Sequence, residues 1–199
     1  MASSWSTLAR LPSVPFPIVI AVMLPIAVGG HAAGSAGAAW GLVSGLFTGF
    51  VPHLLDRHAK RRRAPSTSTP PRPLTQIAGT TVSLLLGLVI VLAGHAPQPL
   101  VACSVVFFAL MVAIVSIQRL CSWNISIHGA SAGAATSISF LLWGPALGLL
   151  AVVLTLLIVM SRVRIHRSTS GLQGHEPLEA VSGALLGAAL GGSIYVLLS

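Results

Sequence analysis

A histidine and a glutamate four positions apart, His175 and Glu179, form the pattern in this chain most suited to chemistry. Residues four apart on a helix share a face, so the Glu179 carboxylate can hold one imidazole nitrogen of His175. The intervening Glu176-Pro177 is typical of a helix start, where proline is tolerated and acidic residues interact favourably with the helix dipole. The positive end of a helix also stabilises phosphate. The pattern therefore predicts a histidine placed where a phosphoryl group would be bound.

The small number of acidic residues and cysteines excludes several classes of enzyme. The chain has only three acidic residues, Asp56, Glu176 and Glu179, whereas enzymes that hold diphosphates through magnesium need clusters of carboxylates. This excludes aspartate-rich prenyltransferases, metal-dependent terpene cyclases and two-metal phosphotransferases. Two cysteines, Cys103 and Cys121, make neither a zinc site nor a disulfide framework. We therefore expect no metal and no cofactor, and chemistry carried by histidine, arginine and backbone amides.

The composition indicates that a membrane bundle must position these residues. Of 199 residues, 54% are hydrophobic and 7% charged, whereas a soluble domain carries about a quarter charged residues. We predict one all-α membrane domain over residues 1–199, a polytopic bundle of six to seven transmembrane helices with a hairpin at Trp143-Gly144-Pro145. The seven candidate spans cover residues 14–30, 33–55, 75–94, 99–118, 125–142, 145–160 and 178–198. The Gly/Ala-rich stretches 129–135 and 183–192 predict closely packed helix faces.

The charges are distributed unevenly between the loops that these spans define. All eleven lysines and arginines fall in the loops on one side, and the opposite loops carry no formal charge. This is the positive-inside pattern, which predicts that the charged side is cytoplasmic. The net charge of +8 is thereby explained by topology and by contact with membrane lipids, so no nucleic-acid partner is expected. The sequence does not indicate an oligomeric state.

Three stretches on the charged side resemble, in order, the motifs of the type 2 phosphatidic acid phosphatase (PAP2) superfamily. Those motifs are Lys-x6-Arg-Pro, Pro-Ser-Gly-His and Ser-Arg-x5-His-x3-Asp, and the chain is similar in particular to small bacterial members. The matching residues are Arg72-Pro73, Ser126-Ile127-His128, and Ser161-Arg162 with His175-x3-Glu179. The resemblance covers a core over residues 57–187, preceded by N-terminal helices in 1–56 and followed by the end of the last helix in 188–199.

The resemblance implies a role for each matching residue. His175 would attack phosphorus and form a phosphohistidine, with Glu179 orienting it, and His128 would protonate the leaving oxygen. The substrate phosphate would be bound by three further side chains, those of Arg162, Arg72 and Ser126. No metal or cofactor is needed for this reaction.

The chain departs from the superfamily pattern at several positions. Pro65 stands where the first motif has its lysine, and Ile127 replaces the glycine of the second motif. Arg162 lies 13 residues before His175, whereas the superfamily spacing is six. The longer spacing indicates an insertion of seven residues within 166–174.

The resemblance implies metal-independent hydrolysis of a lipid-linked phosphate or diphosphate by a protein of the bacterial inner (plasma) membrane. A cytoplasmic site favours prenyl diphosphates as substrates, because they are made on that side. Two alternatives stay open. The same fold could act as a prenyl diphosphate cyclase or synthase, or the chain could be a non-catalytic lipid-binding or transport protein.

Overall fold

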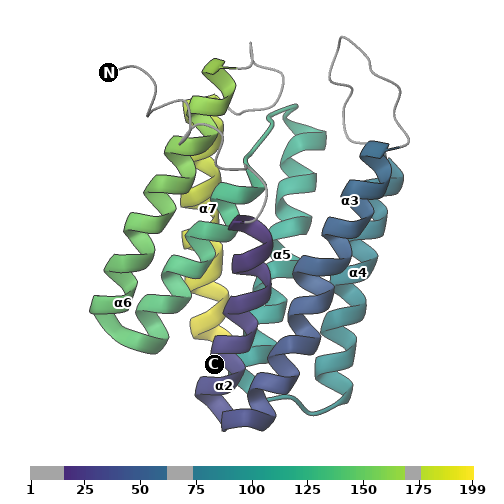
Figure 1. The fold of residues 1–199 in the computed structure, drawn as a ribbon, viewed down its shortest axis with the longest axis vertical. Coiled ribbons are helices and arrows are strands. Elements are labelled where there is room, and N and C mark those ends of the chain that lie inside the picture. The colour runs from purple at the N-terminus through teal and green to yellow at the C-terminus, as the bar shows by residue number, and fades with distance from the viewer. Residues whose placement is uncertain (1–15, 62–73, 169–175) are drawn as a thin grey trace.

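The computed structural model describes residues 16–61, 74–168 and 176–199, and every regular element in these ranges is a helix (Figure 1). The all-α prediction is therefore confirmed for this part of the chain. The elements are α2 (Phe16–Gly45), the π-helical turn η1 (Leu46–Phe50), α3 (Val51–Arg61), α4 (Leu74–Ala93), α5 (Gln98–Leu120), α6 (Ile127–Ser168) and α7 (Pro177–Leu198).

Two of these helices fold back on themselves at a glycine. The backbone leaves helical geometry at Gly34 in α2 (φ +58°) and at Gly144 in α6 (φ +78°), conformations that glycine adopts without a steric penalty. Figure 1 shows the chain reversing at both places, so each helix consists of two antiparallel arms. In α6 the arms are joined by a hydrogen bond of 2.8 Å between the hydroxyls of Thr136 and Thr155. The predicted hairpin at Gly144 is confirmed.

The length and apolar character of the helices are compatible with a membrane protein. Four segments are long and apolar enough to cross a bilayer, and Ile77–Ala93 is a shorter apolar helix. The four are Val19–Leu55, Gln98–Leu120, Ile127–Ser161 and Pro177–Leu198. The first and third, with 37 and 35 residues, are far longer than the roughly 20 residues that one crossing needs, and they contain the two hairpins.

Large apolar side chains cover much of the outer surface of the bundle. Leu156, Leu157, Leu185 and Leu197 are each more than half exposed, and many similar side chains lie around them. Water-soluble monomers rarely expose continuous apolar surface of this kind. The surface is instead suited to contact with lipid.

Helix α5 supplies the centre of the buried core. It contacts α2, α4, α6 and α7, and Leu100, Val106 and Ile114 on it are almost completely buried. A buried hydrogen bond of 3.0 Å between the hydroxyls of Ser44 and Ser104 connects α2 to α5. The other helices are thereby held in fixed positions around α5, including α6 and α7, which carry most of the predicted site.

Candidate functional site

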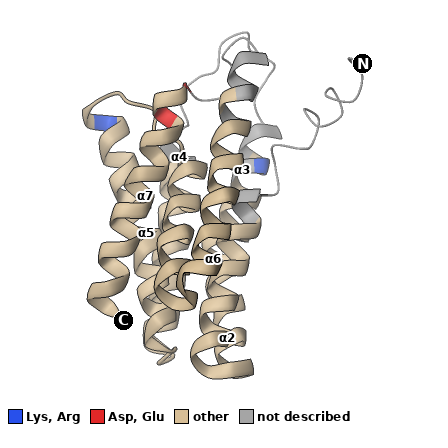
Figure 2. Ribbon diagram, turned by 90° about the vertical axis from the view of Figure 1, so that its left-hand side faces the viewer, with Lys and Arg blue, Asp and Glu red and all other residues tan. Residues whose placement is uncertain are grey.

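The charged residues that the structure describes gather at one end of the bundle. Figure 2 shows the described lysines, arginines and acids at the end where α3 and α5 finish and α7 begins. The other end holds the hairpin turns of α2 and α6 and the turn between α4 and α5, with no charged side chain among the described residues. Two stretches of the predicted motifs that the structure describes, Ser126–His128 and Glu179, adjoin the charged end.

The starts of α6 and α7 lie side by side at this end. The backbone N–H of Ser126 donates a hydrogen bond of 3.1 Å to the backbone carbonyl oxygen of Glu179. Ser126 directly precedes α6, and Glu179 is in the first turn of α7. The structure thus brings the Ser126–His128 stretch and Glu179 together across 53 residues of sequence.

Glycines allow the two helix starts to come this close. A Cβ atom built on Gly183 of α7 would lie 2.5 Å from the carbonyl oxygen of Ser126, and one on Gly129 of α6 would lie 2.6 Å from that of Ala180. Gly187 and Gly191 continue the same close contact along α7. Small residues of this kind let helix backbones approach one another in membranes. The predicted close packing of 129–135 and 183–192 is confirmed, and it determines the geometry between the helix starts.

Ser126 caps helix α6. Its side chain is completely buried, and its Oγ atom accepts a hydrogen bond of 3.2 Å from the backbone N–H of Gly129. This satisfies one of the N–H groups that a helix leaves unbonded in its first turn. The sequence interpretation considered Ser126 only as a phosphate ligand and missed this role. A serine directly before a helical apolar segment is the signal that could have revealed it.

Glu179 is held at the start of α7 by its own helix. Its Oε2 atom accepts a hydrogen bond of 3.2 Å from the backbone N–H of Glu176, which is half of the capping-box pattern. Helix α7 begins at Pro177, so the proline occupies the first helical position as the sequence predicts. The side chain of Glu179 is half-buried. Its carboxylate therefore stays beside the positive end of the helix.

His128 occupies the first turn of α6. Its side chain is half-buried, with the Nδ1 atom inside the protein. It is two residues from Ser126, the residue that contacts the start of α7. The imidazole of His128 therefore lies at the N-terminus of α6, close to the start of α7.

The second arm of α6 returns the Ser161-Arg162 segment to the same end. Thr155 donates a hydrogen bond of 3.1 Å to the carbonyl oxygen of Ala132, which fixes the register of the hairpin. The second arm continues from there toward the charged end, to Ser168. Ser161 itself donates a hydrogen bond of 2.7 Å to the carbonyl oxygen of Ile158.

Part of the predicted site lies outside the described residues. His175 and Arg72 fall in the ranges 169–175 and 62–73, and the side chain of Arg162 is likewise not described. The structure therefore brings together the starts of α6 and α7, with Ser126, His128 and Glu179.

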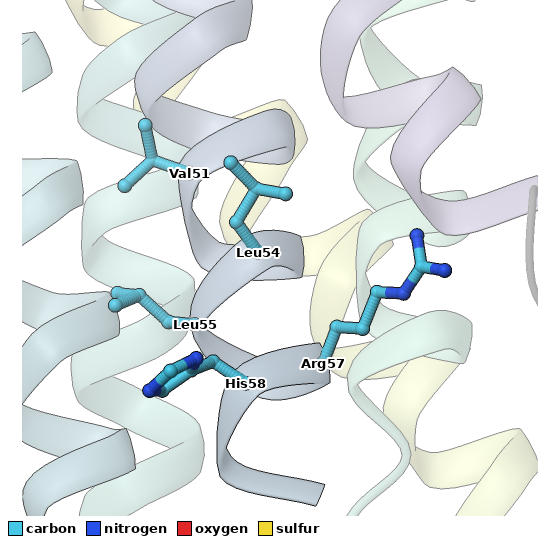
Figure 3. A pocket seen from close by; sticks show the side chains of 5 residues that line it. All are labelled: Val51, Leu54, Leu55, Arg57 and His58. Atoms are coloured by element: carbon cyan, nitrogen blue, oxygen red, sulfur yellow. The ribbon is translucent and has the colours of Figure 1, made fainter. Parts of the chain in front are cut away.

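A surface pocket of about 480 Å³ lies on α3, away from these residues. Val51, Leu54, Leu55, Arg57 and His58 line it, and Figure 3 shows Arg57 and His58 extending to different sides of the helix. A pocket with apolar walls and basic residues at its charged end is typical of a helix that meets the lipid headgroup region. It contains none of the predicted site residues.

No cluster of metal ligands exists in the described part of the chain, since three or more His, Cys, Asp or Glu side chains nowhere converge there. Cys103 is buried in α5 and Cys121 is exposed at its end.

The chain matches no protein-family model, no curated protein and no solved structure. The resemblance to the PAP2 superfamily therefore depends on the motif residues alone.

Proposed function

We propose that this chain is a membrane phosphatase that hydrolyses a lipid-linked phosphate or diphosphate, with prenyl diphosphates favoured, through a phosphohistidine on His175. The observation that carries the proposal is the hydrogen bond between Ser126 and Glu179, which joins the starts of α6 and α7. This hydrogen bond joins the second and third motif regions, which are far apart in sequence, at the charged end of the bundle.

The helix starts supply an electrostatic reason for phosphate binding. Each helix N-terminus carries the equivalent of roughly half a positive charge and presents backbone N–H groups to an anion. At α7 the carboxylates of Glu176 and Glu179 already cap the N-terminus, so the first turn of α6 is the better candidate for the phosphate. Nearby arginines, as the resemblance implies for Arg72 and Arg162, would add bidentate hydrogen bonds.

The proposed reaction uses three side chains. His175 attacks phosphorus as the bond to the leaving oxygen breaks, and His128 gives its proton to that oxygen. Water then attacks the phosphohistidine and gives a proton to His128, and the N–P bond breaks to release phosphate, which restores both histidines. Glu179 orients His175, and the hydrogen bond from Glu176 to its carboxylate supports that role by limiting its motion.

We also propose seven membrane crossings, with the charged end in the cytoplasm of a bacterial inner membrane. The two arms of each hairpin, in α2 and α6, account for four crossings, and α4, α5 and α7 for three more. The uneven distribution of charge supports this orientation, because basic loops are retained on the cytoplasmic side.

The test is turnover by the full chain, purified in detergent with EDTA present, on farnesyl and geranylgeranyl diphosphate. We expect release of phosphate and the prenyl monophosphate, which a second hydrolysis converts to the linear alcohol and a second phosphate. Activity should be lost completely in His175→Ala and should decrease about 10²- to 10⁴-fold in His128→Ala. His95→Asn is the matched control, because His95 is exposed at the opposite end and asparagine tolerates its positive φ of 53°.

Other outcomes would contradict the proposal in distinct ways. Release of diphosphate with a hydrocarbon or a cyclic alcohol would indicate a cyclase or synthase. Binding of the substrates without turnover would indicate a lipid-binding or transport protein. Activity that persists in His175→Ala would exclude the phosphohistidine.

A further inference from the structure

An apolar groove of about 250 Å³ runs between the first arm of α2 and the hairpin of α6. On α6 its wall includes Ala132, Ala135, Ser139 and Trp143, and on α2 it includes Met23. Its volume exceeds the roughly 150 Å³ of an engineered apolar cavity that binds benzene. The groove therefore has room for a hydrocarbon chain.

The groove and His128 lie on the same face of α6. Ala132, Ala135, Ser139 and Trp143 follow His128 by 4, 7, 11 and 15 residues, a spacing that keeps residues on one side of a helix. The groove thus begins one helical turn from His128 and runs away from the charged end. A molecule with its phosphate at the starts of α6 and α7 would have its tail directed along this groove.

The side chains that line the groove are mostly apolar. Thr155 lines it, and its hydroxyl bonds to the carbonyl oxygen of Ala132 and to the hydroxyl of Thr136. Most other side chains that line the groove are aliphatic. The groove is hollowed at its alanines, because their side chains are shorter than those of the lining residues around them. This chemistry selects an apolar chain.

A pair of aromatic rings lies at the far end of the groove. The rings of Trp143 and His31 meet edge-on, with centroids 6.1 Å apart, and connect α6 to α2. Trp143 directly precedes the turn at Gly144. From Ala132, where the groove begins, to Trp143 the helix rises about 16 Å, at about 1.5 Å per residue. The groove therefore accommodates a chain segment of about this length.

We infer that this groove binds the single tail of a prenyl diphosphate, and that Trp143 with His31 sets the longest tail that fits. The assignment of the headgroup rests on the function proposed above. A phospholipid phosphate is disfavoured, because it brings two chains to a single groove of about 250 Å³.

The first test is photo-crosslinking of the full chain in detergent, using geranylgeranyl diphosphate with a photoreactive group at the end of its tail. We expect mass spectrometry to place the label on peptides containing Trp143 or His31, and excess geranylgeranyl diphosphate to remove it. Ala135→Leu, which fills the groove, should decrease labelling at least fivefold. Ala189→Leu makes the same change on an exposed position of α7 and should leave labelling unchanged. Labelling spread over the outer surface, or labelling not removed by competitor, would overturn the inference.

The second test compares kcat/KM for geranylgeranyl and isopentenyl diphosphate. Ala135→Leu should lower the value for geranylgeranyl diphosphate at least tenfold and leave that for isopentenyl diphosphate within twofold, whereas Trp143→Ala should favour longer tails. Labelling in the groove without turnover would support the groove and reject the phosphatase. Turnover with no labelling in the groove and equal effects on both substrates would reject the groove alone.

Discussion

Substitution of Gly183 by alanine should separate the two helix starts on which the site depends. The new Cβ would lie 2.5 Å from the carbonyl oxygen of Ser126, whereas real Cβ atoms keep at least 3.0 Å from such neighbours. Because the opposing atom belongs to the backbone, it cannot rotate away. The backbones of α6 and α7 must therefore separate by about 0.5 Å, the difference between these two distances.

The expected loss of stability combines two opposing effects. Overpacking costs about 1–3 kcal/mol, and replacing glycine by alanine in a helix returns about 1 kcal/mol. The net free energy of unfolding should fall by up to about 2 kcal/mol, which lowers Tm by up to about 8 °C in a chain of this length. Since misplacement by about 1 Å can reduce activity 10²-fold, we expect about a tenfold loss of phosphatase activity from half that shift.

Gly192→Ala is the matched control on the same helix. Its nearest atom, Cβ of Ser137, would be 3.4 Å away, so no backbone has to move. Helix propensity alone should then raise Tm by about 2–4 °C. Thermal unfolding of both variants in detergent, followed by intrinsic tryptophan fluorescence, checks the prediction. Equal changes of Tm in the two variants, with full activity retained in Gly183→Ala, would refute the reasoning.

Two further substitutions test other features of the fold. Ser126→Ala removes the cap of α6 and should destabilise the protein by about 1 kcal/mol; the amide of Gly129 should exchange its hydrogen faster, and an unchanged exchange rate would contradict the cap. Gly144→Ala forces a Cβ atom into backbone geometry that is almost restricted to glycine (φ +78°, ψ −174°) and should cost about 1–3 kcal/mol. Its Tm should fall, whereas that of Gly30→Ala should not, because a Cβ there meets only the Cβ of Ala38 at 3.6 Å.

Hydropathy predicted where the helices lie better than where they end. The predicted break between 142 and 145 coincides with the turn at Gly144, because glycine and proline interrupt both the apolar pattern and the helix. The predicted end of the apolar span at residue 160 is one residue from the observed end at Ser161, whereas helix α6 itself continues to Ser168. The polar residues after Met160 end the apolar signal but not the backbone hydrogen bonding. The number of membrane crossings stays a prediction.

The meeting of two motif regions could be anticipated from topology, but its geometry could not. Two antiparallel helical arms return the chain to the end of the bundle at which it started. Ser126 and Glu179 are separated by such arms, so they were expected at the same end of the bundle. The hydrogen bond between their backbones depends on which faces of α6 and α7 touch, and therefore on Gly129 and Gly183 as packed in three dimensions. The cap formed by Ser126 was missed because one serine suits both a cap and a phosphate ligand. The roles of His175, Arg72 and Arg162 stay predictions.

The end of the bundle that holds the hairpin turns, where the described residues carry no charge, also affects how the protein is inserted into a membrane. On the seven-crossing arrangement proposed above, the turns at Gly34 and Gly144 and the turn over residues 94–97 are the parts that must pass through the bilayer during biosynthesis. Each lysine or arginine carried to the centre of a membrane helix costs about 2.5–3.5 kcal/mol on translocation scales, and these turns contain neither. Each pair of arms can therefore insert as one unit, leading with its glycine turn.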